Sequence, residues 1–163
     1  MKNIAIYPGS FDPPTNGHLD IVERALTIFE HLIIVVITNP DKKTLFTLEE
    51  RKEMLEKICS EFTNVEIANY EGLIVDFAKQ KNATTIIRGL RMVSDFEYEF
   101  QMALMNRKLN PNIKSVYLMP SPEFSYLSSS LIKEVYSLGG SIKDFIPVIV
   151  EEYLSKKLSG GKE

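Results

Sequence analysis

The chain has 163 residues, which suits one domain with its own core. Its formal net charge of −3 argues against a general nucleic-acid-binding protein, because such proteins are normally basic. The one cysteine, Cys59, is expected to be buried in a helix, and its spacing from His18 and His31 matches no zinc site. With a start too short for a signal peptide and no membrane-length apolar run, we expect a cytoplasmic domain, residues 1–158, and a disordered tail, residues 159–163.

Five short apolar runs have the length of β-strands, and helical patterns separate them. The run at residues 32–38 is almost continuously apolar, which is typical of a strand covered on both faces in a parallel sheet. Right-handed crossovers then give a doubly wound arrangement. The sequence therefore predicts an α/β fold: a single-domain, doubly wound, five-stranded parallel sheet with helices on both faces, of Rossmann-like type. The expected strands cover residues 4–7, 32–38, 65–68, 85–87 and 116–119.

The segment between the first strand and the first helix, residues 7–18, reads Tyr-Pro-Gly-Ser-Phe-Asp-Pro-Pro-Thr-Asn-Gly-His. A helix that starts beyond a strand points its unpaired N–H groups, with their partial positive charge, at the space above the sheet. Phosphate is the natural ligand there. His18 lies in the first turn, where the local field disfavours the imidazolium; it could donate a hydrogen bond to a phosphate or only cap its helix. This segment is the best candidate for a nucleotide site.

Two later helices carry capping boxes, Thr47–Glu50 and Ser94–Glu97. The first of these helices places Arg51 on the same stripe as Leu55. A third helix is expected at about residues 73–81, a fifth from the serine run 128–130, and a last one with Pro147 in its first turn.

The helix at about residues 94–109 has apolar side chains on two sides. Those expected to face the sheet are Phe96, Phe100, Ala103 and Leu104. The others, which fall largely off that stripe, are Tyr98, Met102 and Met105. A second apolar side indicates self-association, and the alternative is a helix wedged between loops.

Three cations follow predicted strands at the edge where open parallel sheets bind their ligands. Lys42 follows the second strand, whereas Arg88 and Arg91 follow the fourth. Their convergence would suit a polyphosphate or two phosphorylated substrates. Taken singly, Lys42 could be a solvated surface residue and Arg88 could form a structural ion pair. The serine run 128–130 could hold a further phosphate or only cap its helix.

Other common nucleotide and hydrolase signatures do not fit. The sequence contains no Gly-x-x-x-x-Gly-Lys-Ser/Thr phosphate loop, no Gly-x-Gly-x-x-Gly after the first strand, and no Gly-x-Ser-x-Gly.

Two motifs together match a known superfamily. Thr15-Asn16-Gly17-His18 resembles the Thr/His-x-Gly-His motif of the nucleotidylyltransferases, and Leu-Ser-Ser-Ser at residues 127–130 resembles their Ile-Ser-Ser-Ser/Thr motif. Further matches extend the likeness over almost the whole chain, which thereby resembles the bacterial phosphopantetheine adenylyltransferases. Leu127 replaces the usual Ile, and Phe124 stands where a larger aromatic often lies. The further matches lie at residues 7–13, 87–91, 95–99 and 128–135.

The resemblance implies transfer of the adenylyl group of ATP to 4′-phosphopantetheine, which gives dephospho-coenzyme A and pyrophosphate in coenzyme A biosynthesis. It implies direct in-line attack without a covalent enzyme intermediate, Mg²⁺ bound with ATP, a homohexamer, and coenzyme A as a feedback ligand. No metal ligand of the chain is expected, since no carboxylate pair presents itself in these loops.

The family's residue roles are carried over to matching positions. The catalytic residues would be Ser10, His18 and Lys42. The phosphopantetheine contacts would be Ser10, Lys42, Leu73, Ile74 and Arg88. The ATP contacts would be Ser10, Phe11, Gly17, His18, Gly89, Leu90, Arg91, Glu99, Phe124, Ser125, Tyr126, Leu127, Ser128, Ser129 and Ser130.

Two alternatives remain at this point. The first is another nucleotidylyltransferase, acting on nicotinate mononucleotide or glycerol phosphate. The second is a non-catalytic nucleotide-binding or scaffold protein that binds ATP without releasing pyrophosphate.

Overall fold

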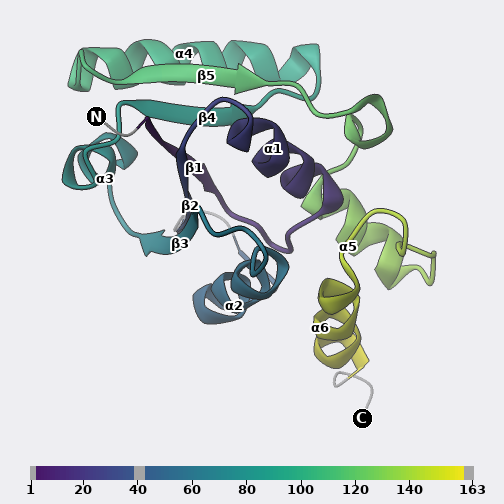
Figure 1. Cartoon of the computed structure of the whole chain (residues 1–163). Coiled ribbons are helices and arrows are strands. Elements are labelled where there is room, and N and C mark those ends of the chain that lie inside the picture. Colours follow the sequence, from purple (N-terminus) through teal and green to yellow (C-terminus); the bar gives the residue numbers. More distant parts are fainter. Residues whose placement is uncertain (1–2, 39–42, 160–163) are drawn as a thin grey trace.

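The computed structural model describes residues 3–38 and 43–159. Five strands form one sheet in the order β3-β2-β1-β4-β5, and every pair of neighbours is parallel (Figure 1). The predicted five-stranded parallel α/β sheet is confirmed. The strands are β1 (Ile4–Gly9), β2 (His31–Ile37), β3 (Val65–Tyr70), β4 (Thr85–Gly89) and β5 (Lys114–Leu118). The helices are α1 (Asn16–Leu26), α2 (Leu48–Ile58), α3 (Ile74–Gln80), α4 (Val93–Leu109), α5 (Ser129–Ser137) and α6 (Val148–Ser159), with a 3₁₀ turn, η1 (Pro122–Phe124).

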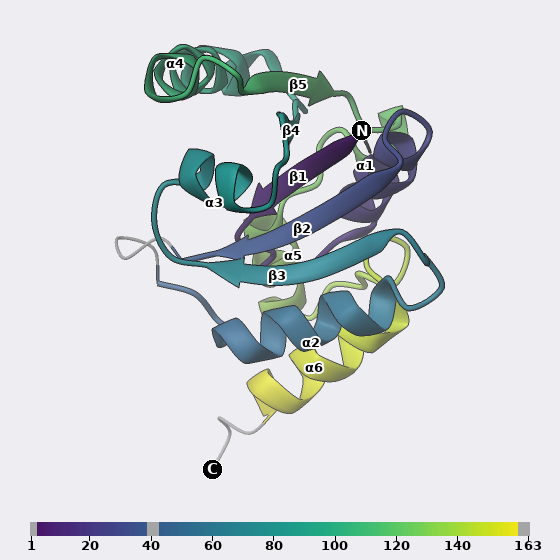
Figure 2. The same ribbon diagram turned by 60° about the vertical axis from the view of Figure 1, so that its left-hand side comes forward.

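The central strands are buried from both sides, as their apolar runs predict. Ala5 and Ile34 pack with residues of α1 and α2 on one face, whereas Ile6 and Ile33 pack with residues of α3 on the other. Figure 2 shows α1 and α3 on opposite sides of β1 and β2. The sheet therefore holds the carboxyl ends of its strands rigidly between two layers of helices.

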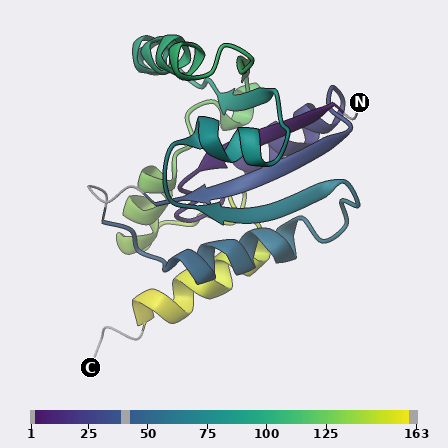
Figure 3. The same ribbon diagram turned by 90° about the vertical axis from the view of Figure 1, so that its left-hand side faces the viewer.

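A third apolar cluster joins α5 and α6 to α2 rather than to the sheet. It contains Met54 of α2, Ile132 of α5 and Leu154 of α6, all with at most 1% of their surface exposed. Figure 3 shows α6 beside α2, on the side of α2 away from the strands. The start of α5 is thereby brought to the same edge of the sheet as the start of α1.

The start of α4 differs from the prediction. The helix begins at Val93, so Ser94 lies inside its first turn instead of capping it. The carboxylate of Asp95, in the first turn, accepts a hydrogen bond from the N–H of Met92 (3.3 Å), the residue that precedes the helix. A side chain of the helix itself thus takes part in its N-terminal cap. The predicted capping box at Thr47, by contrast, is present, with Thr47 and Glu50 bonding each other's backbone N–H.

The orientation of α4 also differs from the prediction. Phe96, Phe100 and Leu104 are about half exposed, and the buried residues of the helix are Glu99 and Asn106. The spacing of apolar residues predicted the wrong buried side of α4, because it takes no account of the ion pair with Arg88 that turns Glu99 inward. The outer side of α4 is consequently more apolar than expected.

Two expected features lie wholly or partly outside the described residues. Lys42 is one, and most of the expected tail, residues 160–163, is the other; α6 itself reaches Ser159. Cys59 is buried at the end of α2, and burial raises the pKa of its thiol to about 11. In the described ranges, no helix has both the length and the apolar character to cross a membrane.

Candidate active site

A cleft of about 300 Å³ lies at the carboxyl edge of the sheet, over the ends of β1 and β4. The strand order reverses at these two neighbouring strands, which is where open α/β sheets bind ligands. Three stretches of chain that are distant in sequence, residues 7–21, 88–99 and 120–130, supply its walls. The lining residues include Pro8–Phe11, Gly17–His18, Arg88–Gly89, Arg91, Asp95, Glu99, Pro120, Phe124 and Leu127–Ser130.

His18 is held in one orientation by the cap of its own helix. Its Nδ1 accepts a hydrogen bond from the backbone N–H of Thr15 (3.0 Å), while the Thr15 hydroxyl accepts one from the His18 N–H (3.3 Å). Burial and, to a smaller extent, the nearby positive charge of Arg91 together lower the pKa of His18 to about 4. The imidazole is therefore neutral at pH 7, and with Nδ1 as acceptor its proton lies on Nε2. This N–H is available to the cleft.

The turn after β1 is shaped by a close approach between Gly9 and Phe11. A Cβ at Gly9 would lie 2.9 Å from the Phe11 ring, so no larger residue fits without displacement. Phe11 itself has a positive φ of 48°, is 2% exposed, and packs edge-on against His18 with ring centroids 5.0 Å apart. Ser10 lies between Gly9 and Phe11 in the sequence and lines the cleft.

Arg51 supports Ser10 from inside the protein. Its side chain is 2% exposed, and its Nη1 donates to the carbonyl of Ser10 (2.8 Å) and to that of Ile37 (3.3 Å). Its Nε donates to the carbonyl of Thr47 (3.2 Å). One guanidinium thus joins the turn after β1, the end of β2 and the start of α2.

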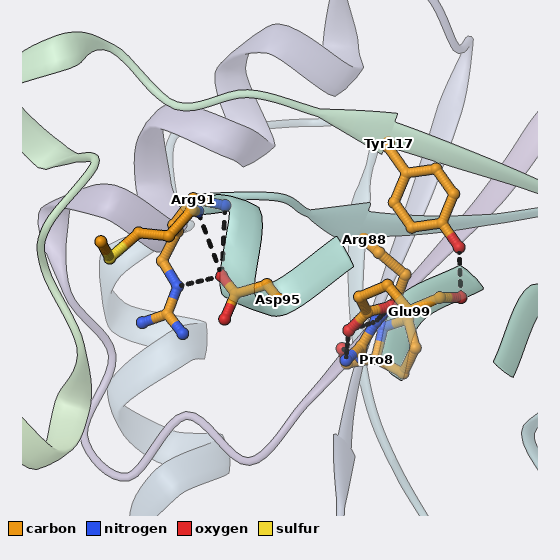
Figure 4. A network of polar contacts seen from close by, with 7 residues as sticks. Pro8, Arg88, Arg91, Asp95, Glu99 and Tyr117 are labelled. Atoms are coloured by element: carbon orange, nitrogen blue, oxygen red, sulfur yellow. Dashed lines mark hydrogen bonds and ion pairs between the residues drawn. The ribbon is translucent and has the colours of Figure 1, made fainter. Parts of the chain in front are cut away.

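Arg88 forms the ion pair that the sequence left as an alternative, and its partner is another predicted site residue. Nη2 lies 2.6 Å from Oε1 of Glu99, and Nε lies 2.9 Å from Oε2 (Figure 4). Nη1 donates to the carbonyl of Pro8 (3.1 Å), and the Tyr117 hydroxyl donates to that of Glu99 (2.7 Å). The pair lines the cleft, so the structural and functional interpretations of Arg88 are compatible.

Arg91 connects the loop after β4 with the segment before α5. Its Nη1 donates to the carbonyl of Leu127 (2.8 Å), and its Nε lies 3.4 Å from Oδ2 of Asp95. Figure 4 shows the pairing of Arg91 with Asp95. The guanidinium lines the cleft beside His18, whose pKa it helps to lower. The cleft therefore contains a cation close to a neutral hydrogen-bond donor.

The serine run forms the N-terminus of α5 in the cleft wall. The Ser128 hydroxyl caps the helix by accepting from the N–H of Leu131 (3.0 Å), and the Ser129 hydroxyl donates to the carbonyl of Pro13 (2.7 Å). The serine run therefore both caps α5 and lines the cleft, so the two interpretations offered by the sequence are compatible. The starts of α1 and α5, each with a partial positive charge, meet at one cavity.

Some of the predicted ATP contacts lie outside this cleft. Leu90 and Ser125 line an adjacent apolar groove, and Tyr126 is half exposed with its ring against Phe145 (6.1 Å between centroids). The predicted contacts that line the cleft are Ser10, Phe11, Gly17, His18, Gly89, Arg91, Glu99, Phe124, Leu127, Ser128, Ser129 and Ser130.

A smaller cavity of about 130 Å³ shares Pro8, Arg88 and Glu99 with the main cleft. Ile74, one of the predicted phosphopantetheine contacts, lines it, whereas Leu73 is 56% exposed and lies outside its walls. Its remaining walls are mostly apolar: Ile37, Ile86, Tyr98, Met102, Ala103, Asn106, Ser115 and Tyr117.

Asp12 is a site-supporting residue that the sequence did not single out. It is 1% exposed and accepts hydrogen bonds from the N–H groups of Leu45 and Phe46 (2.9 Å each) and from Nζ of Lys133 (2.7 Å). Burial alone would raise the pKa of this carboxyl, but these donors hold it below its usual value. The only local signal was a charged residue inside an apolar, proline-rich turn.

The described part of the chain offers no ready metal site. Among residues 3–38 and 43–159, no three His, Cys, Asp or Glu side chains form a group that could hold a metal ion. The two carboxylates that line the cleft, Asp95 and Glu99, are paired with Arg91 and Arg88. A divalent cation would therefore have to bring most of its ligands with it.

Comparison with known proteins gives a family match and several curated relatives of high identity. Residues 6–135 match the family model described as cytidylyltransferase-like. The chain is 53% identical over 154 residues to the phosphopantetheine adenylyltransferase of Caldanaerobacter subterraneus subsp. tengcongensis. This alignment covers 94% of this chain and 96% of that protein. It is 55% identical to that of Alkaliphilus oremlandii over 94% of this chain and 98% of the relative. The Clostridium botulinum protein of the same name is 50% identical to this chain, over 98% of this chain and 97% of that protein.

A solved structure shares the fold at low identity. It is a Vibrio parahaemolyticus protein assigned as a nicotinate-nucleotide adenylyltransferase, with a TM-score of 0.69 and 19% identity over 94% of this chain and 99% of that one. At this identity the likeness concerns the fold alone.

Proposed function

The chain belongs to the phosphopantetheine adenylyltransferases, and we propose on that basis that it transfers the adenylyl group of ATP to 4′-phosphopantetheine in coenzyme A biosynthesis. The products are dephospho-coenzyme A and pyrophosphate. One structural observation carries the proposal: two helix N-termini, two arginines and an imidazole N–H line a single cleft at the reversal of the strand order.

The reaction needs placement and charge neutralisation more than a base. A phosphate oxygen of phosphopantetheine attacks the α-phosphorus of ATP in line, and the bond from that phosphorus to the bridging oxygen of pyrophosphate breaks. The attacking phosphate is already anionic at neutral pH, so no group of the protein has to remove a proton. No covalent enzyme intermediate forms.

His18 acts as a neutral hydrogen-bond donor to the α-phosphoryl group. The Thr15 N–H occupies Nδ1 and leaves Nε2–H for an oxygen that becomes more negative in the transition state. Ser10 lines the same cleft and contributes its hydroxyl and backbone. Lys42, outside the described residues, stays a prediction as the third catalytic group.

The pyrophosphate part of ATP lies between Arg91 and the start of α5. Arg91 supplies a full charge, and the helix start supplies backbone N–H groups with a partial one. The acceptor phosphate lies near Arg88, which among the described residues uses three of its five N–H groups on Glu99 and Pro8. The apolar cavity beside Arg88 would take the pantetheine arm.

Magnesium enters with ATP in this proposal. The two carboxylates that line the cleft are paired with arginines, so phosphate oxygens and water would supply most ligands of the ion. When bound, it supplies further neutralisation of the polyphosphate charge.

The assembly is a homohexamer in the cytoplasm, with coenzyme A as a feedback ligand. The apolar outer side of α4 supports self-association, since Phe96, Phe100 and Leu104 leave about half their surface exposed. The number of subunits, the compartment and the feedback rest on the resemblance.

A pyrophosphate-release assay with ATP and each of three acceptors tests the function. Release is expected with 4′-phosphopantetheine and not with nicotinate mononucleotide or glycerol phosphate. Release with another acceptor alone would refute the substrate, and ATP binding without release would favour a non-catalytic protein.

A further inference from the structure

The carboxylate of Asp12 joins three parts of the chain that are remote in sequence. It lies in the turn that precedes α1, accepts two N–H groups from the segment before α2, and pairs with Lys133 of α5. The side chain of Asp12 is 1% exposed, and that of Lys133 is 24% exposed. The pair is thus a largely dehydrated connection between the turn and α5.

A second contact on the same side of α5 reinforces this connection. Ser129 lies four residues before Lys133, one helical turn away, and its hydroxyl donates to the carbonyl of Pro13 (2.7 Å). Two successive residues of the turn, Asp12 and Pro13, therefore hold two successive turns of α5. Such a two-point attachment restricts both the position of the helix and its rotation.

The attachment lies directly behind the two helix starts that line the cleft. Asp12 and Pro13 lie between Ser10 and the start of α1, and Ser129 is itself the first residue of α5. The distance between the starts of α1 and α5 consequently depends on this contact. A buried ion pair is weak evidence for stability, because apolar replacements are often as stable, so its position suggests a role in geometry.

We propose that Asp12 and Lys133 are positioning residues that set the start of α5 against the start of α1, and so the width of the polyphosphate site. This inference rests on the proposed function, in which these helix starts hold the phosphates of ATP. Displacement of a reacting group by about 1 Å can cost about 10²-fold in rate. Loss of the pair should therefore affect turnover out of proportion to stability.

The test compares Lys133→Met, Lys133→Arg, Asp12→Asn and the double variant Asp12→Asn/Lys133→Met. Lys157→Met is the matched control, because Lys157 pairs with Glu50 (2.8 Å) between α6 and α2, away from the cleft. For each protein, kcat, the KM for each substrate, and the urea midpoint of unfolding are measured.

Lys133→Met is expected to lose about 10²-fold in kcat. Lys157→Met should keep its kcat even if its urea midpoint falls as much. Lys133→Arg should recover most of the rate, and the double variant should be no slower than the slower single one, because the pair acts as a unit. Wild-type kcat in Lys133→Met, or in the isosteric Asp12→Asn if the former does not fold, would overturn the proposal. Full additivity would do so as well.

Calorimetric titration with ATP separates this inference from the proposed function. If wild-type protein binds ATP but transfers nothing to phosphopantetheine, the function fails, and the positioning role is decided by affinity alone. The Kd for ATP should then rise in Lys133→Met and not in Lys157→Met. Equal affinity in both variants would refute the positioning role.

Discussion

The backbone N–H of Thr15 donates a hydrogen bond to Nδ1 of His18 at 3.0 Å, and this contact fixes which nitrogen of the imidazole faces the cleft. It is one half of a capping box, so the requirement to close the start of α1 also orients the proposed catalytic side chain. His18 thereby takes part in capping α1 and is also held in the orientation that its proposed catalytic role requires.

His18→Ala removes the proposed donor to the α-phosphoryl group. Loss of one such donor typically costs about 10²–10³ in kcat, and that loss is expected here. ATP binding should stay measurable by calorimetry, because Arg91 and the start of α5 remain. His31→Ala, which changes a residue at the start of β2 and outside the cleft, is the control. Near-normal turnover in His18→Ala would remove the assigned role.

The ionisation of His18 can be followed by NMR in a His31→Asn variant, which leaves a single histidine. Burial is the main cause that lowers the pKa of His18 from 6.5 to about 4. In the ligand-free protein the imidazole should therefore remain neutral at pH values well below 6.5, with its proton on Nε2. The folded state resists protonation, so the contribution of His18 to stability is complete above pH 6.5 and declines as the pH falls toward 4. A titration midpoint near 6.5, or a proton on Nδ1, would contradict this description.

Gly9→Ala tests the shape of the turn under Ser10. The new Cβ would lie 2.9 Å from the Phe11 ring, and such overpacking typically costs about 1–3 kcal/mol of the free energy of unfolding. Gly17→Ala is a matched control for stability, since its Cβ would meet Phe124 at an ordinary 3.5 Å. Urea denaturation of both variants gives the comparison. Equal stability would mean that the turn adapts without cost.

Arg88→Met removes the cation at the proposed acceptor phosphate and leaves the 8%-exposed carboxylate of Glu99 without its partner. The kcat/KM for phosphopantetheine should therefore fall more than the Kd for ATP rises, and stability should fall as well. Lys81→Met breaks a pair of similar length, 2.6 Å to Glu66, at β3, far from the cleft. That variant should change stability only. An equal effect of Arg88→Met on both substrates would argue against the assignment.

Phe100→Glu tests the apolar outer side of α4. Phe100 stacks on Phe96 with ring centroids 5.8 Å apart, and both are about half exposed. Light scattering should show an oligomer for the wild type and a smaller species for Phe100→Glu, because a charge would be buried in the contact. Leu138→Glu, at an exposed position after α5, should leave the mass unchanged. A wild-type monomer would contradict the self-association.

Features set by neighbouring residues could be predicted from the sequence. The continuous apolar run of β2 indicated a strand covered on both faces, and the Thr47 capping box marked the start of α2. The serine run marked the start of α5 in the same way. Each of these depends on residues within one or two turns.

Features set by distant partners could not be predicted. Glu99 turns inward because Arg88, on another element, pairs with it, so apolar spacing assigned the wrong side of α4. Asp12 finds its donors at Phe46 and Lys133, which no local pattern links to it. The loops and helix starts of the cleft can therefore be predicted from neighbouring residues. The contacts that support the cleft join distant elements and become visible only in the folded structure.

The stereochemical course of the reaction tests the central claim most directly. ATP carrying sulfur in place of one α-phosphoryl oxygen, in a single configuration, is incubated with 4′-phosphopantetheine and the enzyme. The configuration at phosphorus in the dephospho-coenzyme A product is then determined by ³¹P NMR. Direct in-line attack in this cleft predicts inversion. Retention would indicate a covalent adenylyl-enzyme, and absence of the product would contradict the function itself.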